Sequence, residues 1–287
     1  MKIKIGTRKS RLAIIQTEMT ISALNQSFPD IETEIVPIST KGDKILDKPL
    51  SQIGGKGIFV SEIESALQSG KIDIAIHSAK DLPVCMGDGL EISGTLKRGN
   101  YRDVLVTMSD RAFEKTDDFI IGTGSLRRRI NIKKLYKNAD FKDIRGNVDT
   151  RLRKLADGEY DAVILAAAGL ERLGLLSDEK YMFYQFDFND FLPAPCQGII
   201  AIESRKNDFV TPIINKISDK NTFYCFETER TVLEILNADC TMPVGAYSEI
   251  KGNKVTLTVS ADSEKTVSGT ADISHRYELA RELILQL

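Results

Sequence analysis

Short apolar runs that alternate with segments of helical periodicity constrain the fold of this chain more than any other feature. Residues 2–5 (KIKI) and 32–38 (ETEIVPI) are typical of strands, and residues 10–25 between them space apolar side chains as a helix does. A second helix over 59–68 follows a glycine-rich loop and precedes a strand at 72–76 (IDIAI). The alternation predicts an α/β architecture with largely parallel sheets.

The same alternation begins again near residue 97. Strands are expected at 103–107, 119–122, 141–145 and 161–166, with helices at about 125–138 and 147–157. Beyond a proline-bearing break, residues 199–203 (IIAIE) predict an isolated strand that could return to the first sheet. From residue 221 a long helix, alternating strands such as 255–259 and a helix after His275 indicate a small α+β unit. Two α/β lobes joined by crossing segments predict a central cleft, where such folds bind ligands.

Charge is distributed unevenly along the chain. The 287 residues carry a formal net charge of −2, which argues against a protein that coats nucleic acid as a whole. Residues 123–154, however, hold eleven lysines and arginines against three aspartates, a local charge of +8 that leaves −10 for the remainder. Any function has to account for this arginine-rich segment.

Several of these arginines sit where a strand gives way to a helix. Gly122 to Ser125 forms a turn that opens the helix carrying Arg127 and Arg128. Arginine in a first helical turn opposes the helix dipole unless an anion offsets it, so we favour an anion site over the alternative, a serine N-cap with a solvated basic face.

Two further junctions repeat this arrangement. They contribute Arg145, Gly146 and Arg151, and then Arg172 after the next strand. Three such junctions in series indicate a polycarboxylate or polyphosphate ligand, because the guanidinium fork pairs bidentately with these groups.

Three other segments carry reactive or mobile groups. HSAKDLP places Lys80 beside Asp81 after a strand, which suits acid–base or electrostatic chemistry as well as it suits a surface turn with a local ion pair. The glycine-rich stretch 54–59 fits a flexible lid or a plain linker equally. Cys240 lies in a polar loop, where a thiol is accessible to covalent chemistry, although most cysteines are buried core residues.

Processing and metal signals are weak. The N-terminus has no apolar region or cleavage site typical of a signal peptide, and no apolar run approaches the roughly 20 residues of a membrane span. Four scattered cysteines and two histidines give no zinc-ligand spacing. The four cysteines are interpreted as reduced, mostly buried thiols. We therefore expect a cytoplasmic, metal-free protein.

Together the motifs resemble one family. Eight motifs occur in the order found in porphobilinogen deaminases, also called hydroxymethylbilane synthases. They are Arg8-Lys9-Ser10 with Gln16, GGKGIF, HSAKDLP, GTGSLRRR, IRGNVDTR, AAAGLERLG, LPAPCQG and NADCTMPVG. The resemblance covers residues 2 to about 250. It departs at Ala79, at Cys196, and at Ala238-Asp239 before the loop cysteine, where the family usually has a bulkier apolar residue, a Gly or Ala, and a Gly-Gly pair.

The resemblance implies two lobes like those of periplasmic binding proteins, with a central cleft, and a small α+β C-terminal domain. The expected limits are 1–96 with 192–217 for domain 1, 97–191 for domain 2 and 218–287 for domain 3. It also implies a monomeric cytoplasmic transferase of tetrapyrrole (haem) biosynthesis that acts on porphobilinogen, without nucleic acid or membrane. Such enzymes condense four porphobilinogen molecules head to tail on a dipyrromethane bound covalently to the loop cysteine, here Cys240. Four ammonia are released, and water then frees hydroxymethylbilane.

The resemblance also implies roles for individual residues. Asp81 matches the catalytic aspartate, which would hydrogen-bond pyrrole N–H groups and stabilise the cation formed as the amine leaves. The residues expected around the cofactor are Cys240, Asp81, Lys80, Thr123, Ser125, Arg127, Arg128 and Gly146. Those expected around the substrate are Arg8, Ser10, Gln16, Lys56, Phe59, Arg145, Arg151, Arg172 and Gln197.

Two other classes of function compete with this prediction. A two-lobed binding protein for a polyanion would share the fold and the arginines but would give no role to Cys240 or Asp81. A nucleic-acid binder would use residues 123–154, yet aromatic residues are not interleaved there and the remaining −10 would repel phosphates.

Overall fold

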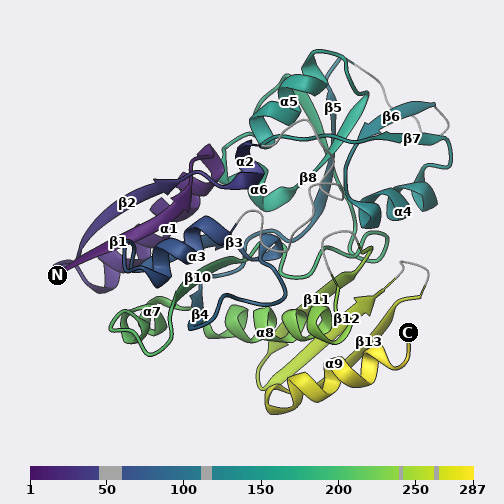
Figure 1. The fold of residues 1–287 in the computed structure, drawn as a ribbon. Coiled ribbons are helices and arrows are strands. Elements are labelled where there is room, and N and C mark those ends of the chain that lie inside the picture. Colours follow the sequence, from purple (N-terminus) through teal and green to yellow (C-terminus); the bar gives the residue numbers. More distant parts are fainter. Residues whose placement is uncertain (45–59, 111–117, 239–241, 262–264) are drawn as a thin grey trace.

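The strands in the described part of the chain form three separate sheets. The structure is a computed structural model, and it describes residues 1–44, 60–110, 118–238, 242–261 and 265–287. Two sheets have five strands each and belong to two α/β lobes, and a three-stranded sheet lies near the C-terminus (Figure 1). The predicted fold class, two α/β lobes with a small α+β C-terminal unit, is confirmed.

The first lobe contains strands from two distant parts of the chain. Its sheet has the order β2-β1-β3-β10-β4. The strands are β1 (Lys2–Arg8), β2 (Glu32–Ile38), β3 (Ile74–Ser78), β4 (Leu90–Thr95) and β10 (Ile200–Arg205). The helices are α1 (Arg11–Ser27), α2 (Lys41–Lys44), α3 (Ser61–Gln68) and α7 (Thr211–Ile217). The isolated strand expected at 199–203 is therefore β10, which pairs with both β3 and β4.

The second lobe follows the same plan, with the strand order β7-β6-β8-β5-β9. Its strands are β5 (Asp103–Met108), β6 (Phe119–Gly122), β7 (Ala139–Lys142), β8 (Ala162–Ala166) and β9 (Tyr181–Gln185). Its helices are α4 (Leu126–Leu135), α5 (Val148–Ala156) and α6 (Ala167–Arg172). The strand predicted at 141–145 ends earlier, at Lys142.

The sheet of each lobe mixes parallel and antiparallel pairs, whereas the alternation predicted largely parallel sheets. β1 runs parallel to β2 and β3, whereas β10 runs antiparallel to both of its neighbours. In the second lobe β5 is the reversed strand, antiparallel to β8 and β9. In each lobe the reversed strand is the first one that the chain forms after crossing from the other lobe, because β5 follows β4 and β10 follows β9.

The C-terminal unit packs two helices against its sheet (Figure 1). It comprises α8 (Lys220–Ile235), β11 (Gly245–Lys251), β12 (Lys254–Ser260), β13 (Val267–Asp272) and α9 (Arg276–Ile284). β12 shows why alternation predicted it: Val255, Leu257 and Val259 are fully buried, while the threonines between them face the other side.

A buried ion pair joins the C-terminal unit to the segments that cross between the lobes. Arg98 lies just after β4 and donates to both carboxylate oxygens of Glu229 on α8, at 2.6 and 3.2 Å. Glu229 is fully buried and also accepts from the backbone N–H of Cys196 at 2.6 Å and from Ser248. Cys196 adopts a φ of 62°, which explains why a glycine suits this position.

Candidate functional site

Asp81 ends a single 3-10 turn, Ala79–Asp81, that directly follows strand β3. Its side chain is exposed, and among the described residues it has no side-chain hydrogen bond. Lys80 is half-buried beside it and donates to Gln197 Oε1 at 3.2 Å. The surface-turn alternative with a local Lys80–Asp81 ion pair is not seen, so the Asp81 carboxylate is available to a ligand.

Charged groups of both lobes act on Arg151 in the second lobe. Burial, with smaller contributions from the charges of Arg128 and Arg145, lowers the pKa of Arg151 to about 10, and the charge of Asp81 opposes this shift. Arg151 therefore lies within electrostatic range of Asp81 in the first lobe and of Arg128 and Arg145 in its own lobe.

Arg127 and Arg128 have a partner that the sequence did not reveal. Asp103, at the start of β5, is fully buried; its Oδ2 accepts from Arg127 at 2.8 Å and its Oδ1 from Arg128 at 2.7 and 2.9 Å. Both guanidiniums also donate to backbone carbonyls, of Leu192 and Ile164. Burial opposes ionisation of Asp103, but the two arginines overcome it and hold its pKa at about 2.

Asp103 accounts for the two arginines in the first turn of helix α4. The expected alternative of a solvated basic face is wrong, because Arg127 and Arg128 are buried. An anion does offset them, as the helix-dipole argument required, and one such anion is internal. Two guanidiniums against one carboxylate still leave one positive charge, enough to attract one carboxylate of a ligand.

Several other predicted residues shape the loops. Thr123 Oγ1 accepts from the backbone of Ser125, and Ser125 Oγ caps α4 by accepting from Arg128 N at 3.5 Å. Ser10 caps α1 in the same way. Gly146 adopts a φ of 108°, and its carbonyl accepts from Arg151 Nε at 2.9 Å.

Gln16 and Gln197 are buried, and both ends of each side-chain amide have partners. Gln16 bonds the hydroxyl of Ser78 at the end of β3, while Gln197 accepts from Lys80 and donates to the carbonyl of Tyr101 at 2.7 Å. Both side chains thus position elements around Asp81.

Arg172 and Arg8 occupy different surroundings. Arg172 donates to the carbonyl of Gly198 at 2.7 Å, beside the segments that cross between lobes, and burial lowers its pKa to about 10. Arg8 ends β1 and is half-buried.

The first residue of HSAKDLP differs from expectation. His77 lies within β3, not in the loop after it, and its Nε2 is 2.8 Å from Oε2 of Glu203 on the neighbouring β10. Both side chains are buried. His77 therefore belongs to the sheet beneath Asp81.

Three predicted residues, Cys240, Lys56 and Phe59, lie outside the described residues. Of the other cysteines, Cys196 and Cys225 are buried as expected, but Cys85 is exposed. Within the described ranges, no group of three or more His, Cys, Asp or Glu side chains is placed to hold a metal ion. No described helix is both long and apolar enough to cross a membrane.

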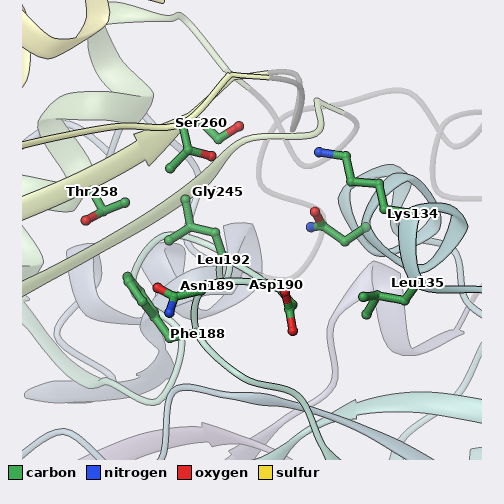
Figure 2. A pocket seen from close by; sticks show the side chains of 11 residues that line it. Lys134, Leu135, Phe188, Asn189, Asp190, Leu192, Gly245, Thr258 and Ser260 are labelled. Atoms are coloured by element: carbon green, nitrogen blue, oxygen red, sulfur yellow. The ribbon is translucent and has the colours of Figure 1, made fainter.

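A cavity of about 240 Å³ lies between α4 and the C-terminal sheet (Figure 2). Its walls include Asn131, Phe188, Leu192 and Ser260. Of the predicted site residues that the structure describes, none lines it, so we place the candidate site at Asp81 and the arginines.

Comparison with known proteins assigns this arrangement to a family. The porphobilinogen deaminase, dipyromethane cofactor binding domain, matches residues 3–211, and the porphobilinogen deaminase C-terminal domain matches residues 223–285. The porphobilinogen deaminase of Acetivibrio thermocellus is 45% identical over 258 residues, covering 90% of this chain and 87% of its own. That of Rickettsia typhi is 46% identical over 249 residues, covering 86% and 83%.

Solved structures show a more distant likeness. The periplasmic VFT2 domain of BvgS from Bordetella pertussis is 16% identical, with a TM-score of 0.46, and covers 75% of this chain and 86% of its own. The family matches span nearly the whole sequence. The chain therefore belongs to the porphobilinogen deaminase family of transferases.

Proposed function

We propose that this chain joins four porphobilinogen molecules head to tail on a dipyrromethane held by Cys240, and that water then releases hydroxymethylbilane. The observation that carries the proposal is that the exposed carboxylate of Asp81 lies within electrostatic range of Arg151, on which Arg128 and Arg145 also act. Each porphobilinogen unit brings two carboxylates and a pyrrole N–H, so both kinds of group would find partners here.

The residues present fit a dipyrromethane. Arg127 and Arg128 retain one positive charge beyond what Asp103 neutralises, and Lys80 lies within range of both arginines. Ser125 and Thr123 hold the loop from which these arginines begin. When bound, the dipyrromethane supplies the pyrrole carbon to which the first porphobilinogen is joined.

Asp81 would act on the reacting ring. In each step the C–N bond of the substrate's aminomethyl group breaks, ammonia leaves, a C–C bond forms to the preceding ring, and that ring loses a proton. The Asp81 carboxylate accepts hydrogen bonds from pyrrole N–H groups and offsets the positive charge that develops on the substrate ring. Arg145 and Arg151 would bind the acetate and propionate side chains of the substrate. Arg8 and Arg172 are the other two arginines proposed to bind these carboxylates.

The domain limits, the remaining site residues, the oligomeric state and the location in the cell are further parts of the proposal. The pairing of β10 with β3 and β4 supports a discontinuous first domain with the limits given above. Several assignments stay predictions. They are the roles near the ligand of Ser10, Gln16, Gln197 and Gly146, and those of Lys56 and Phe59 in a covering loop. A monomeric state and a cytoplasmic location also stay predictions.

Intact mass spectrometry tests the covalent link. We expect the mass of the purified chain to exceed its sequence mass by that of two porphobilinogen molecules less two ammonia. One ammonia is released when the thioether forms and one when the two rings are joined. Cys240→Ala should abolish the increment, whereas Cys85→Ala, which removes an exposed thiol elsewhere, should retain it. A wild-type chain at the bare sequence mass that cannot consume porphobilinogen would contradict the proposal.

The Cys240→Ala variant also allows a test of Lys80 by pH. Burial lowers the pKa of Lys80 to about 8, although Asp81 raises it. Unfolded lysine titrates at about 10.4, so between these values the unfolded state binds more protons and the free energy of unfolding should rise with pH. Urea unfolding at several pH values should show this rise.

Two controls define the result for Lys80. In the Cys240→Ala background, Lys80→Met should remove the rise, while Lys71→Met, at an exposed site, should leave it intact. With the cofactor bound, a carboxylate beside Lys80 would move the rise to higher pH. Equal rises in both lysine variants would show that Lys80 titrates normally.

A further inference from the structure

The segment that follows Asp81 is held by a helix of the C-terminal unit. Arg230 on α8 donates to three consecutive carbonyl oxygens, those of Leu82 at 3.3 Å, Pro83 at 2.5 Å and Val84 at 2.6 Å. Its side chain is buried, and among the described residues no carboxylate forms an ion pair with it. Within the described ranges, the polar groups that its guanidinium contacts are these backbone carbonyls.

One turn earlier, Phe226 completes the contact. It lies on the same face of α8, four residues before Arg230, with the guanidinium carbon 6.0 Å from its ring centre. Phe226 packs in a buried cluster with Ala79 and Leu82, the residues on either side of Lys80 and Asp81. The turn that carries Asp81 thus packs on the Phe226 ring, and the residues that follow it are bound by the Arg230 guanidinium.

The same helix leads toward the cofactor cysteine. α8 ends at Ile235, and Cys240 follows five residues later. The turn that bears Asp81 is thus held by the helix that precedes Cys240 in the sequence. A small shift of a catalytic group from its reacting partner costs orders of magnitude in rate.

We propose that Arg230 is a positioning residue that fixes the turn bearing Asp81 against helix α8; this inference rests on the proposed function. Arginine suits the task because its planar fork reaches several carbonyls at once, whereas a lysine ammonium is a compact point charge on a flexible stem. Arg230→Lys keeps the charge and most of the stem but not this geometry.

Arg205 provides a matched control. Its Nη1 also donates to two carbonyls of the first lobe, those of Leu67 and Ile72, but this contact lies at the α3–β3 connection. Arg205→Lys should therefore perturb the lobe without moving the Asp81 turn.

The first measurement is steady-state kinetics of the cofactor-loaded enzyme. We expect Arg230→Lys to lower kcat about 10- to 100-fold with little change in KM for porphobilinogen, while mass spectrometry shows the cofactor retained. Arg205→Lys should keep kcat near the wild-type value. A kcat near wild type in Arg230→Lys, or an equal loss in the control, would overturn the inference, as would loss of the cofactor.

Two further readouts separate positioning from general support. Hydrogen exchange in the peptide covering residues 82–89 should be faster in Arg230→Lys and unchanged in Arg205→Lys. In an Asp81→Asn background, Arg230→Lys should reduce kcat little further, because it acts through Asp81; fully multiplicative losses would contradict this. Should the lysine variant not fold, Arg230→Gln, which keeps an amide donor, takes its place in all three measurements.

The outcomes also distinguish this inference from the function it rests on. A wild-type chain without adduct or turnover would remove the proposed function itself. An active, loaded wild type with an unaffected Arg230→Lys variant would remove only the role of Arg230.

Discussion

Replacing Asp81 with asparagine should reduce turnover of porphobilinogen by about 10²- to 10⁴-fold while the cofactor stays attached. The change preserves the size of the side chain but removes the charge that would stabilise the cationic ring of the substrate. Asp81 is exposed and makes no side-chain hydrogen bond among the described residues, so its loss should cost little stability. Rate measurement, intact mass and thermal unfolding together check these three expectations.

Asp88 serves as the control for this prediction. It is an exposed aspartate a few residues along the same segment, and only its backbone carbonyl is contacted, by Gln68. Asp88→Asn should leave turnover unchanged. Near-normal turnover of Asp81→Asn would remove this carboxylate from the mechanism, whereas loss of the adduct would assign it to cofactor attachment.

Much of the fold could be predicted because its signals are local. The residue range 32–38 agrees with β2, and Ser10 caps α1 where the helical pattern begins. β9 was missed because both of its faces carry apolar or aromatic residues: Tyr181 packs in the core, whereas Met182 and Tyr184 are exposed, so the sequence YMFYQ lacks a polar–apolar alternation. Strands β5 and β10 were predicted, but their reversed direction was not, since strand direction depends on pairing between distant segments.

The candidate site shows the same division. The motifs predicted a common site for Asp81, Arg128, Arg145 and Arg151, and the charges of the first three act on Arg151. Asp103 was overlooked because it opens an otherwise apolar strand, DVLVT, which was interpreted as a strand only. A carboxylate at the start of a buried strand in an arginine-rich lobe is a signal that could have found it, because buried charges require partners.

Asp103→Asn should destabilise the protein by about 3–5 kcal/mol, because it leaves two buried guanidiniums without their shared counter-charge. Asp143→Asn is the matched control, since Asp143 pairs with Arg129 of the same helix at a partly exposed position. An exposed pair contributes only about 0–1 kcal/mol. Urea unfolding at neutral pH gives both free energies of unfolding, and a loss no larger than that of the control would contradict the role of Asp103.

The stabilisation by Asp103 should also depend on pH in a defined window. Its pKa is held at about 2 in the folded protein, below the ordinary value of 3.8, so between these values the unfolded chain binds more protons. The contribution is therefore complete above about pH 4 and is lost as the pH falls toward about 2. Wild type and Asp103→Asn should differ in free energy of unfolding by a constant amount from neutral pH down to about pH 4, and the difference should narrow below it. A difference that persists unchanged to the lowest pH would mean that the variant is destabilised by poor packing, and not by the loss of the charge that holds Arg127 and Arg128.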